Sequence, residues 1–244
     1  MNSMNVIREC LPGPDMMTRD KLYINGSWVP SSGESSLTVE NPTNGEIIGS
    51  VPDGTIEDAD LAVDAARNAF GDWSKSSVEE RISILHSLSD QFKQRADEIA
   101  ELITREVGTP IEYSKVAMVG TPRVVSKSYA KLLESYQWEE HVRNSTIVKE
   151  PIGVCAFVTP WNFPLHQIIG KVAPAIAAGC TMVLKPSREA PLNAFLLADM
   201  LKEIGLPSGV FNLVSGRGST VGTRLSSHPD VDMISFTGST SAGI

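Results

Sequence analysis

An asparagine at position 162 lies in a setting suited to stabilising a negatively charged oxygen. Asn162 stands between Trp161 and Phe163, and prolines at positions 160 and 164 restrict the backbone on both sides. A side-chain amide held in this way can donate hydrogen bonds to an oxyanion that forms during a reaction at a carbonyl group. An asparagine in such a turn also commonly stabilises the turn itself, so this residue alone leaves both roles open.

A second group of residues is suited to binding a ligand that carries phosphate. Lys185 could hydrogen-bond a ribose or a phosphate, and the segment from Gly216 to Gly222 is rich in glycine. Glycines let backbone N–H groups approach an anion, and a helix N-terminus adds a favourable dipole. The usual Gly-x-Gly-x-x-Gly dinucleotide motif fails here, because its last position is Val221 and the glycine follows one residue later. A turn tightened by glycine therefore explains this segment about as well, and Lys185 could equally be a solvated strand end.

These residues follow apolar segments that have the length of buried strands. The predicted strands cover residues 152–158, 181–185, 210–214 and 231–236, and predicted helices at 164–178, 190–204 and 216–227 alternate with them. Apolar strands separated by helices indicate a parallel sheet that is covered on both faces. In this doubly wound α/β fold, ligands bind at the carboxyl ends of the strands. Asn162 and Lys185 lie at two of these ends.

The first half of the chain has a different pattern. Residues 21–51 contain short extended pieces with Asn-Gly pairs at 25–26 and 44–45, which are typical of β-hairpins. Helical periodicity then begins at Thr55, where Asp58 three residues later resembles a capping box. Within the helical residues 111–135, a proline at position 122 predicts that two helices meet near Val119.

The composition is that of a soluble globular protein. Hydrophobic residues make up 41% of the 244 residues, charged residues 20%, and the net charge is −8, which excludes a mainly disordered chain. Basic residues do not cluster, so nucleic acid is not an expected partner. Without an apolar run of membrane-spanning length, and with three widely spaced cysteines, we expect a cytoplasmic protein with no membrane partner and no disulfide framework. The histidines form no ligand pairs either, so no metal site is expected.

Five segments taken together resemble one known family. TPWNFP, AAGCTMVLKPS, GLPSGVFNLVSGRG and SFTGST occur in this order, and NPTNGEIIGSVPDG lies upstream of them. At these spacings they closely resemble NAD(P)-dependent aldehyde dehydrogenases over about residues 22–244. The resemblance implies a mostly parallel, Rossmann-like sheet. It also implies an oxidoreductase that converts a small-molecule aldehyde to a carboxylic acid, with hydride transfer to NAD or NADP.

The resemblance also implies roles for individual residues. In that family a cysteine thiolate attacks the aldehyde, a side-chain amide holds the oxyanion, and a glutamate-activated water hydrolyses the thioester. The amide corresponds to Asn162, which is thereby the implied catalytic residue. The implied cofactor-binding residues are Thr159, Pro160, Trp161, Lys185, Ser187, Arg188, Gly216, Gly218, Gly222, Phe236, Thr237, Gly238 and Ser239. Lys185 would bind the adenosine ribose, and the glycines would lie beside the adenosine and the pyrophosphate.

The sequence departs from the family pattern in two places. Arg188 stands where many NAD-preferring relatives carry a glutamate that binds the ribose hydroxyls, so the choice between NAD and NADP stays open. The sequence also ends in FTGSTSAGI, before the family's segments that bring the catalytic glutamate and cysteine. Cys155 and Cys180 are predicted to be buried in or beside strands, and Cys10 precedes the resemblance, so none is the expected nucleophile.

We therefore expect a fragment that carries the cofactor-binding half, and we leave its own activity open. The alternative is a non-catalytic truncated homologue that binds nucleotide or pairs with a full-length relative. The predicted organisation is a flexible leader at 1–20, a cofactor-binding domain formed by 21–135 and 152–244, and an oligomerisation strand segment at 136–151. The family uses this last region in a small oligomerisation sheet, which implies a homo-oligomer, dimer or tetramer, for the full-length protein.

Overall fold

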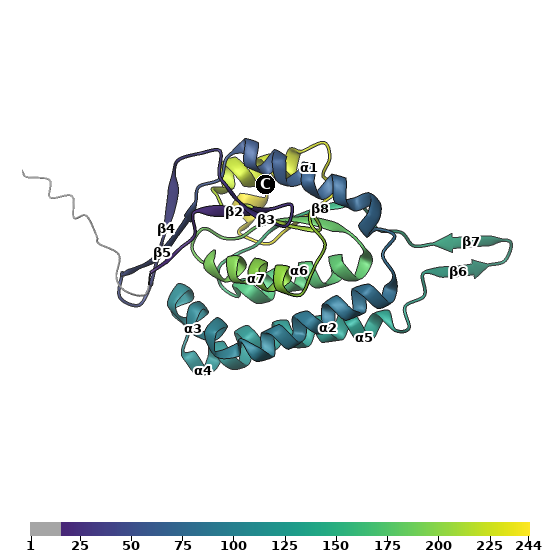
Figure 1. Cartoon of the computed structure of the whole chain (residues 1–244), viewed down its shortest axis with the longest axis horizontal. Helices are drawn as coiled ribbons and strands as arrows, with labels where there is room; N and C mark the ends of the chain where they lie inside the picture. Colours follow the sequence, from purple (N-terminus) through teal and green to yellow (C-terminus); the bar gives the residue numbers. More distant parts are fainter. Residues whose placement is uncertain (1–15) are drawn as a thin grey trace, which may run out of the picture.

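The computed structural model describes residues 16–244 and has a central six-stranded sheet with helices on both faces (Figure 1). The strand order is β11-β8-β9-β10-β2-β3. The strands are β2 (Lys21–Ile24), β3 (Ser27–Pro30), β8 (Val154–Val158), β9 (Thr181–Lys185), β10 (Phe211–Leu213) and β11 (Met233–Phe236). The first four strands in this order are parallel, and β2 and β3 continue the sheet in antiparallel fashion. The prediction of a mostly parallel, doubly wound sheet is confirmed.

Helices cover the two faces of this sheet unequally. One face packs against α1 (Ile56–Trp73) and α8 (Thr223–Ser227), and the other against α6 (Pro164–Ala178) and α7 (Leu192–Glu203). A further layer of α2 (Val78–Gln94), α3 (Ala96–Val107) and α5 (Gly120–Leu133) lies outside α6 and α7 (Figure 1). The larger apolar core therefore lies on the α6 and α7 side of the sheet.

Local sequence signals explain where several of these elements begin. Thr55 Oγ1 accepts a hydrogen bond from the N–H of Asp58 at 3.2 Å, and Asp58 accepts one from the N–H of Thr55 at 3.0 Å, which confirms the capping box of α1. The hairpin between β2 and β3 turns at Asn25 and Gly26, with φ values of 51° and 75°. These are the positive values that a two-residue turn requires.

The predicted meeting of two helices near Val119 is a change of helix type. After α4 (Ile111–Tyr113) the chain forms the π-helical segment η1 (Ser114–Val119) and passes directly into α5. Pro122 has no N–H to donate to the preceding turn, so the hydrogen-bond pattern must change close to this point. The helix accommodates this by widening locally instead of ending.

A separate three-stranded sheet stands beside the main one. It consists of β1 (Met17–Thr18), β5 (Ile47–Pro52) and β4 (Ser36–Glu40), in this order. Residues 1–15 of the predicted leader lie outside the described residues. Met17 and Thr18 pair with Gly49 and Ser50 of β5, so the ordered main-chain pairing begins before the predicted boundary at residue 20.

The segment predicted for oligomerisation forms a hairpin. β6 (Glu139–Val142) and β7 (Ser145–Val148) pair only with each other and extend away from the rest of the described chain (Figure 1). All eight strand residues are exposed. An extended conformation was expected here, whereas the role in oligomerisation stays a prediction.

The start of β8 provides a test of this packing. Gly153 has a φ of 129°, and a Cβ at this position would collide with the Asp232 carboxylate, which accepts a hydrogen bond from the N–H of Val154 at 2.7 Å. We expect Gly153→Ala to lower the free energy of unfolding by at least about 2 kcal/mol. Gly71→Ala in α1 is the matched control, because nothing lies within 4 Å of its added Cβ, and it should raise stability by about 0.5–1 kcal/mol. Urea titrations compare the two, and equal effects would contradict the prediction.

Candidate functional site

The carboxyl ends of the parallel strands bring the predicted site residues to one edge of the sheet. Thr159 follows β8 directly, and its N–H donates to the carbonyl oxygen of Lys185 at the end of β9, at 3.2 Å. On the other side of β8, the N–H of Thr237 donates to the carbonyl oxygen of Val158 at 3.0 Å. Residues from three segments that lie far apart in the sequence therefore meet, as predicted.

Lys185 is the buried cation of this edge. It is 5% exposed, and its Nζ donates to the carbonyl oxygen of Pro186 at 2.9 Å. Burial, together with the nearby positive charge of Arg188, lowers the pKa of Lys185 to about 8. A Cβ at Gly222 would lie 3.7 Å from Cδ of Lys185, so the lysine side chain runs beside the glycine segment.

The glycine segment continues from β10 into a π-helical turn, η2 (Gly218–Gly222), and then into α8. Gly216 has a φ of 149°, and a Cβ there would lie 2.7 Å from Val221 and 3.0 Å from the carbonyl oxygen of Gly54. Glycine at this position is therefore required by packing. At Gly218 an added Cβ would meet nothing within 4 Å, so the segment borders open space at this position.

The loop after β8 presents Trp161 and Asn162 at the surface. Both residues are exposed, and α6 begins two residues after Asn162, with Pro164 in its first position. Proline is favoured there because the first N–H of a helix has no intrahelical acceptor. The ring of Phe163 meets that of Tyr113 edge-on at 6.4 Å between centroids. The Asn162 amide is thus held on a constrained loop with its side chain open to a ligand.

The residues after β11 mostly have partners within the chain. The exposed Phe236 ring lies against Gly238, where an added Cβ would come 2.5 Å from Cζ of the ring. Ser239 caps the short helix α9 (Thr240–Gly243), and its Oγ accepts from the N–H of Ala242 at 3.3 Å. Glycine at 238 and serine at 239 thus have structural roles whether or not they contact a cofactor.

The loop between β9 and α7 carries the residue that bears on cofactor choice. Ser187 Oγ accepts from the N–H of Glu189 at 3.3 Å, and Arg188 Nε donates to Glu189 Oε1 at 2.7 Å. The side chain of Arg188 is 59% exposed, so this pair is a weak surface contact. The guanidinium can therefore exchange its partner for an anionic ligand.

An unpaired buried hydroxyl at this edge fits a ligand that carries hydroxyl and phosphate groups. The Thr159 hydroxyl is buried and has no hydrogen-bond partner among the described residues. Such a group costs free energy unless something binds it. Together with the Lys185 ammonium and the open space at Gly218, it suits the ribose and phosphate groups of a dinucleotide.

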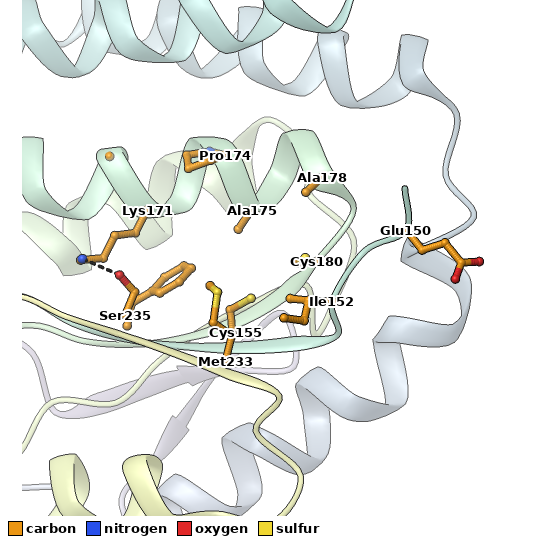
Figure 2. Close-up of a pocket in the computed structure, with 12 residues that line it drawn as sticks. Glu150, Ile152, Cys155, Lys171, Pro174, Ala175, Ala178, Cys180, Met233 and Ser235 are labelled. Atoms are coloured by element: carbon orange, nitrogen blue, oxygen red, sulfur yellow. Dashed lines mark hydrogen bonds between the residues drawn. The ribbon is translucent and has the colours of Figure 1, made fainter. Parts of the chain in front are cut away.

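Lys171 of α6 was not among the site residues predicted from the sequence. Lys171 in α6 donates from Nζ to Ser235 Oγ on β11 at 2.7 Å, across a cavity of about 450 Å³ (Figure 2). Burial lowers the pKa of Lys171. It is the only lysine, arginine, aspartate or glutamate in residues 164–178. A single charged residue in an otherwise apolar helix is the sequence signal that could have identified it.

Cys155 and Cys180 line the same cavity (Figure 2). A hydrogen bond between the two thiols raises the pKa of Cys155, with burial adding to the effect, and lowers that of Cys180. They are 1% and 3% exposed, in agreement with the predicted burial. Cys10 lies outside the described residues.

Residues 16–244 lack two further kinds of feature, a metal-binding cluster and a membrane-spanning helix. No group of three or more His, Cys, Asp or Glu residues there could hold a metal ion. In the same residues, no helix combines the length and the apolar character that a membrane crossing needs.

The lowered pKa of Lys185 predicts a pH effect on stability. Between about pH 8 and pH 10.5 the unfolded chain keeps a proton that the folded chain has released, so stability should rise with pH by up to about 1.4 kcal/mol per unit. Lys185→Met should remove this rise, and Lys202→Met, on the exposed side of α7, is the control. Unfolding free energies from urea titrations at pH 8, 9 and 10 check it. A constant difference between the original chain and Lys185→Met would contradict the prediction.

Comparison with known proteins identifies the family. A model of the aldehyde dehydrogenase family matches residues 28–244. The chain is 47% identical over 226 residues to a 3-succinoylsemialdehyde-pyridine dehydrogenase from a Pseudomonas species, which covers 91% of this chain and 47% of that protein.

Solved structures agree with this match. Aldehyde dehydrogenase C from Pseudomonas syringae, in complex with NAD+ and octanal, superposes with a TM-score of 0.91 at 44% identity, over 92% of this chain and 46% of that one. Betaine aldehyde dehydrogenase from Staphylococcus aureus, in complex with NAD+, gives a TM-score of 0.89 at 38% identity, over 92% and 46% of the two chains. This chain thus spans about half the length of these relatives. On this evidence the chain belongs to the aldehyde dehydrogenase family.

Proposed function

We propose that this chain supplies the cofactor-binding part of an NAD(P)-dependent aldehyde dehydrogenase, an enzyme that oxidises an aldehyde to a carboxylic acid. The observation that carries the proposal is the convergence of Thr159, Lys185 and Gly222 at one edge of the parallel sheet. Ligands of doubly wound sheets bind at this edge. Family membership and the NAD+ complexes of the two similar structures support the same reading.

The residues at this edge have distinct proposed tasks toward NAD or NADP. The Lys185 ammonium binds the hydroxyls of the adenosine ribose, and the Thr159 hydroxyl gains the partner that it lacks. The backbone around Gly218 lies beside the pyrophosphate, where no side chain blocks close approach. The remaining residues expected at the cofactor are Pro160, Trp161, Ser187, Arg188, Gly216, Gly222, Phe236, Thr237, Gly238 and Ser239. Bound at these residues, the dinucleotide would supply the acceptor for the hydride of the substrate.

Asn162 is the proposed catalytic residue of this chain. Its side-chain amide donates to the aldehyde oxygen as negative charge develops there, and the constrained loop before α6 fixes its direction. Removing one donor of this kind commonly slows a reaction by about a hundredfold to a thousandfold. Cys155 and Cys180 are buried, so neither is proposed as the attacking thiol.

A non-catalytic homologue that binds nucleotide, or that pairs with a full-length relative, is the second candidate function. It is favoured by one observation: the only two cysteines of the described residues are buried. Absorbance of reduced nicotinamide, recorded with the purified chain, an aldehyde and NAD or NADP, separates the two. Aldehyde-dependent reduction excludes the second candidate, whereas nucleotide binding without reduction favours it.

The exposed hairpin of β6 and β7 is the proposed oligomerisation element. Its strands have unpaired outer edges that a strand of another copy could join, giving a dimer or tetramer. We also place the protein in the cytoplasm, because the buried Cys155 and Cys180 are free thiols. The small-molecule aldehyde itself is not specified by these residues.

Arg188 provides a test of cofactor choice. Its exposed guanidinium can pair with a 2′-phosphate, so Arg188→Glu should raise the ratio of the Kd for NADP to that for NAD by at least about tenfold. Lys185→Ala should instead weaken both dinucleotides, because both contain the adenosine ribose. Lys202→Glu carries the same charge change outside the site and is the control. Calorimetric titrations measure each Kd, and an unchanged ratio for Arg188→Glu would count against the assignment.

A further inference from the structure

The buried carboxylate of Glu106 lies at the N-terminus of α7 and has no role in the site described so far. Glu106 is the penultimate residue of α3 and is 4% exposed. One of its oxygens accepts the N–H of Leu192, and the other accepts the N–H of Asn193 at 3.1 Å and Nδ2 of Asn193 at 2.9 Å. Helix α7 begins after Pro191, and no side chain within the helix caps it. Glu106 therefore supplies, from another helix, the acceptor that these buried N–H groups need.

This contact controls one end of the loop that carries proposed cofactor contacts. Residues 186–191 connect β9 to α7 and contain Ser187 and Arg188. The loop starts at Lys185, which is held by its pairing with Val158 of β8. It ends at the first turn of α7, which is held by Glu106. Both ends are thus attached to rigid elements.

The hydrogen-bond network also reaches back into the loop itself. Asn193 Nδ2, which donates to Glu106, donates as well to the carbonyl oxygen of Ala190 at 2.8 Å. Glu106 also lines a pocket of about 480 Å³ together with Glu189 of the loop and Trp161 of the segment before α6. Glu106 therefore borders the same pocket as the loop that carries Ser187 and Arg188 and the segment that carries Asn162.

We propose that Glu106 is a positioning residue for the cofactor: by holding the first turn of α7, it keeps loop 186–191 in the conformation that presents Ser187 and Arg188 to the 2′ position of the adenosine ribose, beside the Lys185 contact. The inference rests on the proposed cofactor site. Glu106 itself touches no cofactor and acts through Leu192 and Asn193. Without its carboxylate, the loop keeps its anchor at β9, but the first turn of α7 loses its anchor to α3, so the contacts that Ser187 and Arg188 make weaken first.

Glu106→Gln tests the proposal, because it keeps the shape of the side chain but places an NH₂ group against N–H donors. The probes are AMP and 2′-deoxy-AMP, which differ only in the ribose hydroxyl. We expect Glu106→Gln to weaken AMP binding by at least about tenfold and to bring the AMP to 2′-deoxy-AMP affinity ratio toward one. Hydrogen exchange at residues 186–193 should become faster in the same variant. Calorimetry on the whole chain, well below its melting temperature, measures the affinities.

The controls separate positioning from general stability. Glu98→Gln makes the same chemical change on the same helix, at a half-exposed carboxylate that pairs with Arg95, and should leave the affinity ratio unchanged. Asn193→Ala removes two hydrogen bonds but keeps the carboxylate, and should give an intermediate effect if Glu106→Gln does not fold.

The outcomes distinguish this inference from the proposed function. If the original chain binds AMP in preference to 2′-deoxy-AMP and Glu106→Gln keeps that preference, Glu106 is a structural cap only and the inference is wrong. If the original chain does not bind AMP, the proposed cofactor site is wrong, and the inference is overturned with it.

Discussion

Main-chain pairing of the four parallel strands is the constraint on which the candidate site depends. At the carboxyl ends, Val158 of β8 is in register with Lys185 on one side and with Phe236 on the other. A shift of one residue in either ladder would turn the following side chains to the opposite face of the sheet. Because β8 and β9 are buried among apolar side chains on both faces, that register is strongly specified. The strand register therefore also determines where the loops after the strands begin.

The charged groups near this edge that are buried or partly buried are held mainly by neutral groups of the chain. Lys185 donates to a main-chain carbonyl oxygen, Lys171 to the hydroxyl of Ser235, and Glu106 accepts from main-chain N–H groups and an amide. Burial without a matching opposite charge is costly, which is why the pKa of Lys185 falls and that of Glu106 rises, the latter to about 7. The pKa values of groups held in this way shift strongly when a ligand brings polar or charged atoms close to them.

Features that depend on residues adjacent in the sequence could be predicted before the fold was known. The apolar strands, the capping box at Thr55 and the Asn25-Gly26 turn are each determined by a few adjacent side chains and their backbone preferences. The π-helical segment before α5 could not be predicted from the sequence. The backbone conformations that accommodate Pro122 differ little in local energy, and packing decides among them. Pairing of Met17 with β5 was missed for a similar reason, since a two-residue strand has no pattern of its own.

The sequence alone therefore determined the family, the alternation of strands and helices, and the residues that follow each strand. Tertiary structure decided which of those strand ends are neighbours, because the order β11-β8-β9-β10 does not follow the order along the chain. It alone placed Glu106 against Leu192, 86 residues away, and Lys171 against Ser235, 64 residues away. Such contacts form only when whole helices and strands pack together. The free energy that favours them comes from burying surfaces of several elements at once, so no short stretch of sequence reveals them.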